Sequence, residues 1–273
     1  MSEENKLRAI LCPGCRKLIS AHSEQCPYCG MKNPNLWGLA GLLNRLFGGH
    51  LSLIPIISTA CVALYVVSLL LDPSAIFRAS GILGILSPSG TALFKLGMTG
   101  AFALSEGRWW TLITAIYLHG GILHILFNVL WIRQLGPVVE DLYGLSRSFL
   151  IFTLAGVLGF LLSSLAGNAF TIGASGSIFG LLGALVYYGR KRGGTFGTAL
   201  YRQVGQWAIV LFIFGFLFPG IDNFAHAGGF AGGYLAAAAF GFTELRSETR
   251  THQIMALTTM GLTLLAFLLA WFG

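Results

Sequence analysis

Residues 167–189 read GNAFTIGASGSIFGLLGALVYYG, an apolar segment interrupted by glycines. The part best suited to a helix, 175–189, holds fifteen residues. At ~1.5 Å per residue it measures ~22 Å, whereas the hydrocarbon core of a bilayer is ~30 Å thick. If this segment enters a membrane, residues 167–174 must dip into it as irregular backbone, which is tolerated only inside protein or beside a water-filled cavity. We therefore expect Ser175 at the floor of a wet cleft.

The composition of the whole chain indicates a membrane protein. Of its 273 residues, 55% are hydrophobic and 10% are charged, and the mean hydropathy is +0.75. Soluble domains carry about 25% charged residues, so this chain has too few charges to cover a water-facing surface. We expect an all-α polytopic membrane protein. We expect no secretory signal peptide, because the first long apolar stretch follows a polar segment.

Seven apolar stretches are candidates for membrane spans, for which ~20 residues are required. Residues 1–33 are expected to form a polar N-terminal module, 34–50 an interfacial amphipathic linker, and 51–273 the membrane domain. Residues 72–110 are apolar but contain the breaker sequence SPSG at 87–90, which favours a re-entrant or interfacial loop over an eighth span. The predicted spans are about 51–71, 113–132, 148–167, 175–189, 204–219, 224–242 and 254–272.

The positive charges predict the orientation of these spans. With a cytoplasmic N-terminus, the outside receives only Arg78, Lys95 and Arg108 of the 17 Lys and Arg residues, as the positive-inside rule requires. The net charge of +7 then reflects topology and contact with anionic lipid headgroups, and no nucleic-acid partner is expected. We expect an integral protein of the plasma (inner) membrane of a prokaryote.

The N-terminal module holds four of the five cysteines, as two Cys-x-x-Cys pairs separated by ten residues. Two such turns supply the four thiolates of a tetrahedral Zn²⁺ site, whereas two disulfides are disfavoured in a reducing cytoplasm. We predict a zinc knuckle or ribbon with one structural zinc. Four thiolates leave no open position for catalysis, so the module is either a docking site for a cytoplasmic protein or a stabilising cap. The predicted ligands are Cys12, Cys15, Cys26 and Cys29.

Four polar side chains lie inside the predicted spans, where such groups are costly and usually functional. His124 and Asn128 are four residues apart and share one helix face, while Ser175 and His226 lie at the start of two other spans. These three spans run in the same direction, so the four side chains are expected at a similar depth in the outer half of the bilayer. Polar residues with unrelated structural roles would not be expected to lie at the same depth.

The four side chains can support nucleophilic catalysis. A Ser hydroxyl needs an adjacent base, and His226 is the candidate base for Ser175. Gly229 and Gly233 allow the two spans to approach closely.

A developing oxyanion would also find donors among these residues. The side chains of Asn128 and His124 and the backbone N–H of Ser175, at a helix N-terminus, form a candidate oxyanion hole. No third acid is evident, because Asp222 precedes the span of His226 but need not orient it.

These motifs resemble the rhomboid family of intramembrane serine proteases, over about residues 50–245. The resemblance implies a six-helix core with a seventh C-terminal helix. It also implies cleavage of single-span or polytopic membrane proteins near their outer ends, with Ser175 as nucleophile and His226 as base, and with no metal or other cofactor in catalysis. The first loop of the family commonly ends in Trp-Arg, whereas Thr111 stands here in place of that Arg. The matching motifs are His124-x-x-x-Asn128, Gly173-Ala174-Ser175-Gly176 and Ala225-His226-Ala227-Gly228-Gly229-x-x-x-Gly233.

Two other functional classes compete with the protease. A catalytically inactive rhomboid-like protein would use the same polar layer to bind membrane helices, although loss of the Ser or His would be expected in it and both are present. A transporter would require more intramembrane charge and a repeat between its halves, and no such repeat is evident.

Overall fold

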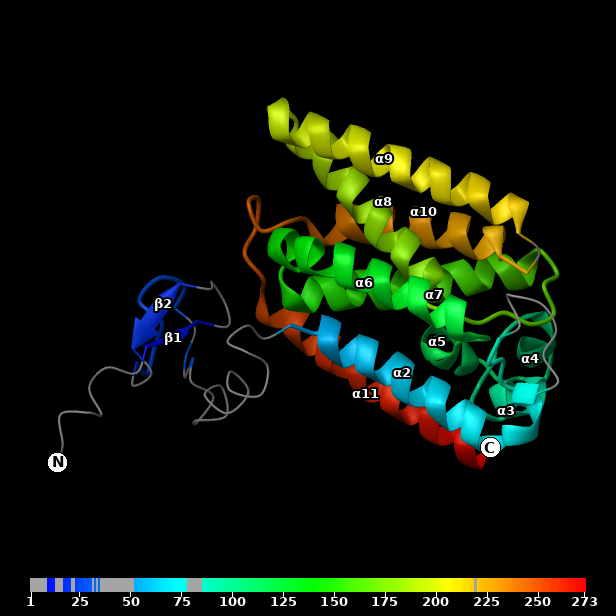
Figure 1. Cartoon of the computed structure of the whole chain (residues 1–273). Helices are drawn as coiled ribbons and strands as arrows, with labels where there is room; N and C mark the ends of the chain where they lie inside the picture. Colours follow the sequence, from blue (N-terminus) through cyan, green and yellow to red (C-terminus); the bar gives the residue numbers. More distant parts are fainter. Residues whose placement is uncertain are drawn as a thin grey trace.

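The computed structural model describes residues 9–12, 17–20, 23–30, 32, 34, 52–77, 85–218 and 220–273. The predicted ligand Cys15 lies outside these residues, and so does the predicted linker 34–50 except for residue 34. At the N-terminus, strands β1 (Ala9–Leu11) and β2 (Leu18–Ser20) pair antiparallel, with Ile10 opposite Ile19. Most of the rest of the described chain is helical (Figure 1).

Seven helices of 18 residues or more make up most of the described chain. Helix α9 lies at one edge of the helical body in Figure 1 and packs on α8. Helix α10 packs between α7 and α8 and contacts both extensively. The seven are α2 (Ile54–Leu71), α6 (Ile122–Tyr143), α7 (Leu145–Leu165), α8 (Ser175–Arg192), α9 (Gly194–Leu217), α10 (Asn223–Phe240) and α11 (Arg250–Phe272).

Five of these helices, α2, α6, α7, α9 and α11, are long and apolar enough to cross a membrane. Helix α8 differs because it ends in Arg190, Lys191 and Arg192, and α10 because it is rich in glycine and contains His226. Both are largely buried by their neighbours, so their surfaces need little apolar area. The chain is thus a mostly helical integral membrane protein.

Two helix starts differ from the predicted spans by nine residues or more. The span expected at 113–132 begins instead at Ile122, because Gly121 has an extended backbone (φ 172°, ψ 167°) and two short helices, α5 (Thr111–Thr114) and η5 (Ala115–Tyr117), precede it. The span expected at 204–219 begins at Gly194. The first turns of α9 are polar, so an analysis of hydropathy finds the apolar part of this helix but misses its N-terminal turns.

Between α2 and α5 the described residues form only short helices, far below the ~20 residues of a span. They are η3 (Pro73–Phe77), α3 (Gly90–Lys95) and α4 (Ala101–Ser105). Residues 85–87 are fixed over the start of α6: Ile122 donates its backbone N–H to the Ile85 carbonyl at 3.2 Å, and Ser87 donates its hydroxyl to the Gly120 carbonyl at 2.7 Å. In the described part of 72–110 no helix thus reaches the length of a span, and the absence of an eighth span stays a prediction because residues 78–84 lie outside the described residues.

Helices α8 and α10 touch through their backbones. A Cβ atom added at Gly229 would lie 2.0 Å from the Gly176 carbonyl oxygen, and one added at Gly233 would lie 2.0 Å from the Gly180 carbonyl oxygen. On the opposite side, a Cβ at Gly159 of α7 would lie 2.5 Å from the Ala225 carbonyl oxygen. Small residues thus allow α10 to fit between α7 and α8, as predicted for Gly229 and Gly233.

Candidate active site

The predicted catalytic side chains lie at the starts of three neighbouring helices. Ser175 is the first residue of α8, and His226 lies in the first turn of α10. His124 and Asn128 lie in the first two turns of α6. Since α8 packs against both α6 and α10, residues far apart in the sequence are brought to one region of the structure.

The ring of His226 is stacked on the ring of Phe179, with centroids 4.2 Å apart and an interplanar angle of 16°. Phe179 is four residues after Ser175 and therefore lies on the same face of α8. The imidazole thus lies on the face of α8 that carries Ser175. Within the described residues there is no hydrogen bond between Ser175 and His226, and the buried Nδ1 atom of His226 has no hydrogen-bond partner.

His124 lies beside the loop that leads to Ser175. Its Nδ1 atom accepts a hydrogen bond from the backbone N–H of Gly120 at 3.3 Å, so in the neutral ring the proton is on Nε2. A Cβ atom at Gly173 would lie 2.5 Å from Nε2, and Gly173 also has a φ of +119°. Space and backbone conformation both require glycine there, two residues before Ser175.

Asn128 is buried, and its side-chain amide donates to the backbone carbonyl of His124 at 2.8 Å. This bond uses one of the two N–H donors of the amide and leaves the other for a substrate oxygen. His119 is also buried, and its Nδ1 atom lies 3.2 Å from the Tyr117 carbonyl oxygen. Its ring contacts that of His124 edge-on, with centroids 5.0 Å apart, so His119 packs against the site.

Thr111, which stands where the family commonly has Arg, is fully buried. Its hydroxyl donates to the Arg108 carbonyl at 2.6 Å and to the Thr99 hydroxyl at 3.0 Å. The guanidinium group of Arg108 lies 4.2 Å from the ring centroid of Phe94 and donates to the Phe94 carbonyl at 3.2 Å. These contacts hold the end of the first loop without an arginine at position 111.

Sequence reasoning missed two functional candidates, Phe179 and Asp222. The spacing of Phe179 from Ser175 was visible, but the stacking depends on how α10 is rotated toward α8. Asp222 was considered only as an acid that could orient His226. Its carboxylate instead accepts hydrogen bonds from residues of α7 and of the loop before α8.

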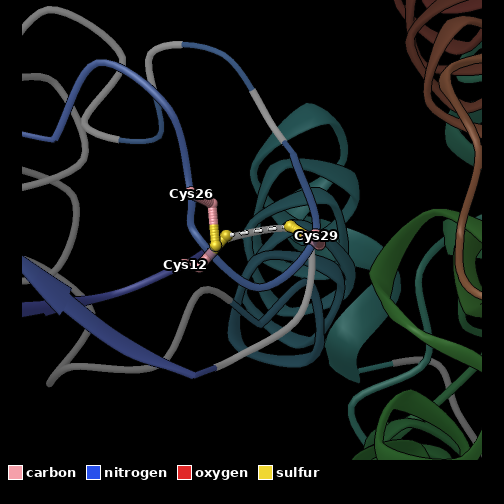
Figure 2. Close-up of side chains that lie close together, drawn as sticks. All are labelled: Cys12, Cys26 and Cys29. Atoms are coloured by element: carbon pink, nitrogen blue, oxygen red, sulfur yellow. Dashed lines mark hydrogen bonds between the residues drawn. The ribbon is translucent and has the colours of Figure 1, made fainter.

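The N-terminal cysteines form a compact cluster (Figure 2). The Sγ atoms of Cys12, Cys26 and Cys29 all lie within 4.8 Å of one another, and those of Cys12 and Cys29 are 3.6 Å apart. A covalent S–S bond would measure about 2.05 Å. With Zn–S bonds of about 2.3 Å, two ligands of a tetrahedral site lie roughly 3.8 Å apart. The described sulfurs therefore have a spacing that suits a metal ion.

The thiol of Cys26 is also poised to ionise. Desolvation raises its pKa, but hydrogen bonds from backbone amides and from the neighbouring thiols outweigh this and lower the pKa to about 6. A thiolate is the form that binds metal. Together with the sulfur spacing, this shows that the cluster could hold a metal ion.

Comparisons with known proteins identify relatives of this chain. The chain is 42% identical over 162 residues to rhomboid protease GluP of Bacillus subtilis, covering 58% of this chain and 31% of GluP. It is 31% identical over 209 residues to RHOMBOID-like protein 1 of Arabidopsis thaliana, covering 69% of this chain and 53% of that protein. RHOMBOID-like protein 5 of the same plant is 36% identical over 161 residues, or 55% of this chain and 50% of its own length.

The chain thus spans between 31% and 53% of the lengths of these relatives. The profile of the Rhomboid domain matches residues 106–242, about half of the chain. This segment runs from the end of the first loop to the end of α10 and includes all four side chains of the candidate active site. The chain belongs to the rhomboid family.

Proposed function

We propose that this protein is an intramembrane serine endopeptidase that cleaves membrane proteins with a dyad of Ser175 and His226. The observation that carries the proposal is the position of the His226 ring, stacked on Phe179 one turn after Ser175. Similarity to rhomboid protease GluP supports the same activity. The site contains the two groups that acyl transfer requires, a hydroxyl and a neutral base.

In the first half of the reaction, the Ser175 Oγ atom attacks the carbonyl carbon of the scissile peptide bond while His226 accepts the hydroxyl proton. His226 then gives this proton to the departing amine, the C–N bond breaks, and an acyl-enzyme ester remains. In the second half, His226 takes a proton from water, which attacks the ester. The ester C–O bond breaks, the proton on His226 passes to the Ser175 oxygen, and the product leaves as a carboxylic acid that releases its own proton to water. The contact between Ser175 and His226 tightens in the substrate complex, as is common for catalytic hydrogen bonds.

Three donors stabilise the oxyanion in this proposal. The backbone N–H of Ser175 lies at a helix N-terminus, where it has no partner within the helix. His124 presents an N–H at Nε2 because its Nδ1 atom is already an acceptor. Asn128 contributes the amide N–H that is not bonded to the His124 carbonyl. Donors fixed in advance around a developing negative charge are a major source of catalysis.

The substrates are single-span or polytopic membrane proteins within the lipid bilayer. With a cytoplasmic N-terminus, the starts of α6, α8 and α10 face the outer half of the membrane, and cleavage takes place near the outer end of the substrate helix. The charge distribution in the sequence supports this orientation, together with a location in the plasma membrane of a prokaryote.

The N-terminal module binds one structural zinc ion through Cys12, Cys15, Cys26 and Cys29. The sulfur cluster of three of these residues supports this assignment. A four-thiolate site is closed to substrate, so the metal stabilises the module and takes no part in catalysis. The module then serves either as a docking site for a cytoplasmic protein or as a stabilising cap.

The experiment is to incubate purified protein in proteoliposomes with a panel of single-span substrates, next to Ser175→Ala. A fluorophosphonate probe, which reacts with activated serines, provides a second readout. Cleavage and labelling by the wild type alone support the proposal. If no substrate is cut and Ser175 is not labelled, while Ser175→Ala still binds membrane helices, the protein is an inactive helix-binding rhomboid relative.

A further inference from the structure

The carboxylate of Asp222 joins three parts of the chain that are distant in sequence. It accepts hydrogen bonds from Asn168 Nδ2 at 3.1 Å and from Thr171 Oγ1 at 2.8 Å, both in the loop before α8. It also accepts a short hydrogen bond from the hydroxyl of Ser163 in α7. Finally, it accepts the backbone N–H of Ala225 at 3.0 Å and so caps α10.

The loop 168–173 is held from its other side by backbone hydrogen bonds to the first loop and its short helices. Ala101 donates its N–H to the Asn168 carbonyl at 2.8 Å, and Thr171 donates its N–H to the Thr99 carbonyl at 2.8 Å. Gly173 donates its N–H to the Ala115 carbonyl at 2.9 Å. These bonds fix the loop to the first-loop region. The carboxylate of Asp222 ties the same loop to the helix that carries His226.

We propose that Asp222 is a positioning residue, which sets the start of α8 relative to α10 and thereby places Ser175 beside His226. This inference rests on the proposed function for its catalytic consequence. Asp222 is adjacent to α10, and the backbone N–H of His226 donates to the Asp222 carbonyl at 3.1 Å. Ser175 follows the loop that the carboxylate holds. One side chain therefore connects the backbone supports of the nucleophile and of the base.

Asp222 does not act as the acid of a catalytic triad. Four donors already point at its two carboxylate oxygens. The Nδ1 atom of His226, to which a triad acid would bind, has no partner among the described residues. The role of Asp222 is thus to fix the geometry of the site, and its loss should affect kcat more than KM.

A simple helix cap is the competing explanation, and it can be separated from positioning by one substitution. In Asp222→Ser the hydroxyl can still accept the Ala225 N–H, as serine does at many helix N-termini. It is too short to reach Asn168 and Thr171 as well. Asp222→Asn keeps a side chain of the same length, with one oxygen that accepts hydrogen bonds and an NH2 group that can donate to hydroxyl oxygens. It should therefore restore part of the network. Thr249, which caps α11 through the His252 N–H, provides a matched cap far from the site.

The test measures cleavage kinetics, the rate of fluorophosphonate labelling, and hydrogen exchange of residues 168–173 in detergent micelles. For Asp222→Ser we expect kcat and the labelling rate to fall about 10²-fold, as small misplacements of reacting groups can produce, with KM nearly unchanged. Exchange in 168–173 should accelerate. Asp222→Asn should recover much of the activity, and Thr249→Ala should lower the melting temperature without changing kcat. Adding Thr171→Val to Asp222→Ser should cost little more, because the two residues share one interaction.

Wild-type kcat in Asp222→Ser would reduce Asp222 to a helix cap and overturn the inference. Unchanged exchange in 168–173 would overturn it as well. If the wild type neither cleaves nor reacts with the probe, the proposed function fails. The exchange measurement then still decides whether Asp222 holds the loop, so the two failures are distinguishable.

Discussion

The imidazole of His226 lies almost parallel to the ring of Phe179, 4.2 Å away between centroids. In a Ser-His-Asp triad, a carboxylate orients the imidazole through Nδ1. Here Nδ1 has no hydrogen-bond partner within the described chain. In the proposed mechanism, the stacked ring of Phe179 therefore orients the imidazole of His226.

Replacing Phe179 should make the orientation of the His226 ring less well defined, while the ring itself remains in the site. Aromatic pairs contribute about 0.5–1.5 kcal/mol beyond burial, so Phe179→Ala should lower kcat by up to roughly tenfold. Phe179→Tyr keeps the ring and should stay close to the wild type. Steady-state kinetics on one substrate would check this. Equal activity of the Ala and Tyr variants would show that the stacking does not orient His226.

Ser175→Ala and His226→Ala should each abolish detectable cleavage, and the double variant should be scarcely worse than either. A nucleophile and its base act as a unit, so their losses are not additive. Ser177→Ala is the matched control, because Ser177 is buried in the same helix and has no proposed catalytic role. Melting temperatures should confirm that all variants fold. Appreciable cleavage by Ser175→Ala would require another nucleophile.

Asn128→Ala should lower kcat by roughly 10²–10³-fold with little change in KM. This is the usual cost of losing one oxyanion donor, which acts mainly in the transition state. In the substrate-free protein the amide binds the His124 carbonyl, so its removal should alter folding stability only modestly. Thermal unfolding measured beside the kinetics would separate the two effects. A variant with wild-type kcat would remove Asn128 from the mechanism.

The purified protein should contain one zinc ion per chain by elemental analysis, and chelation should leave cleavage largely intact. The reason is that a closed four-thiolate site gives the metal no access to substrate. Cys26→Ser should lose the metal. Cys61→Ala should keep it, because Cys61 is fully buried in helix α2. Zinc-free preparations would contradict the metal site, and loss of cleavage in chelated but folded protein would contradict its separation from catalysis.

Gly233→Ala should destabilise the protein by about 1–3 kcal/mol, as overpacking of a tight interior does. The added methyl group would lie 2.0 Å from the Gly180 carbonyl oxygen, which is part of a helix backbone and cannot move away cheaply. Gly205→Ala in α9 is the matched control, since no atom lies within 4 Å of its added Cβ. Thermal unfolding of both variants in the same detergent would test this, and equal melting temperatures would contradict it.

Much of the site could be predicted because its signals are local. The helix predicted at 175–189 is α8, which starts at Ser175 as predicted but continues to Arg192. The spacing of His124 and Asn128 placed both on one face of a helix. The predicted start of α6 was wrong by nine residues, or about two and a half turns, because an apolar segment looks continuous until the extended backbone at Gly121 interrupts it.

The interactions between helices could not be predicted in the same way. Asp222 is 51 residues from Thr171 and 59 from Ser163 along the chain, and no periodicity links such positions. The stacking of Phe179 on His226 depends on the rotation of two helices about their axes. The membrane orientation and the fourth thiolate of the metal site, Cys15, stay predictions.

The contact of α8 with α10 through glycine backbones has a consequence for how the site responds to its surroundings. Where helices touch through side chains, their separation changes as rotamers rearrange with temperature, lipid thickness or substitution. Between Gly229 and Gly176, and between Gly233 and Gly180, there is no side chain to rearrange. The spacing of these two helices is set by covalent bond lengths and atomic radii. The distance between the backbones that carry Ser175 and His226 should therefore stay constant when the surrounding lipid changes.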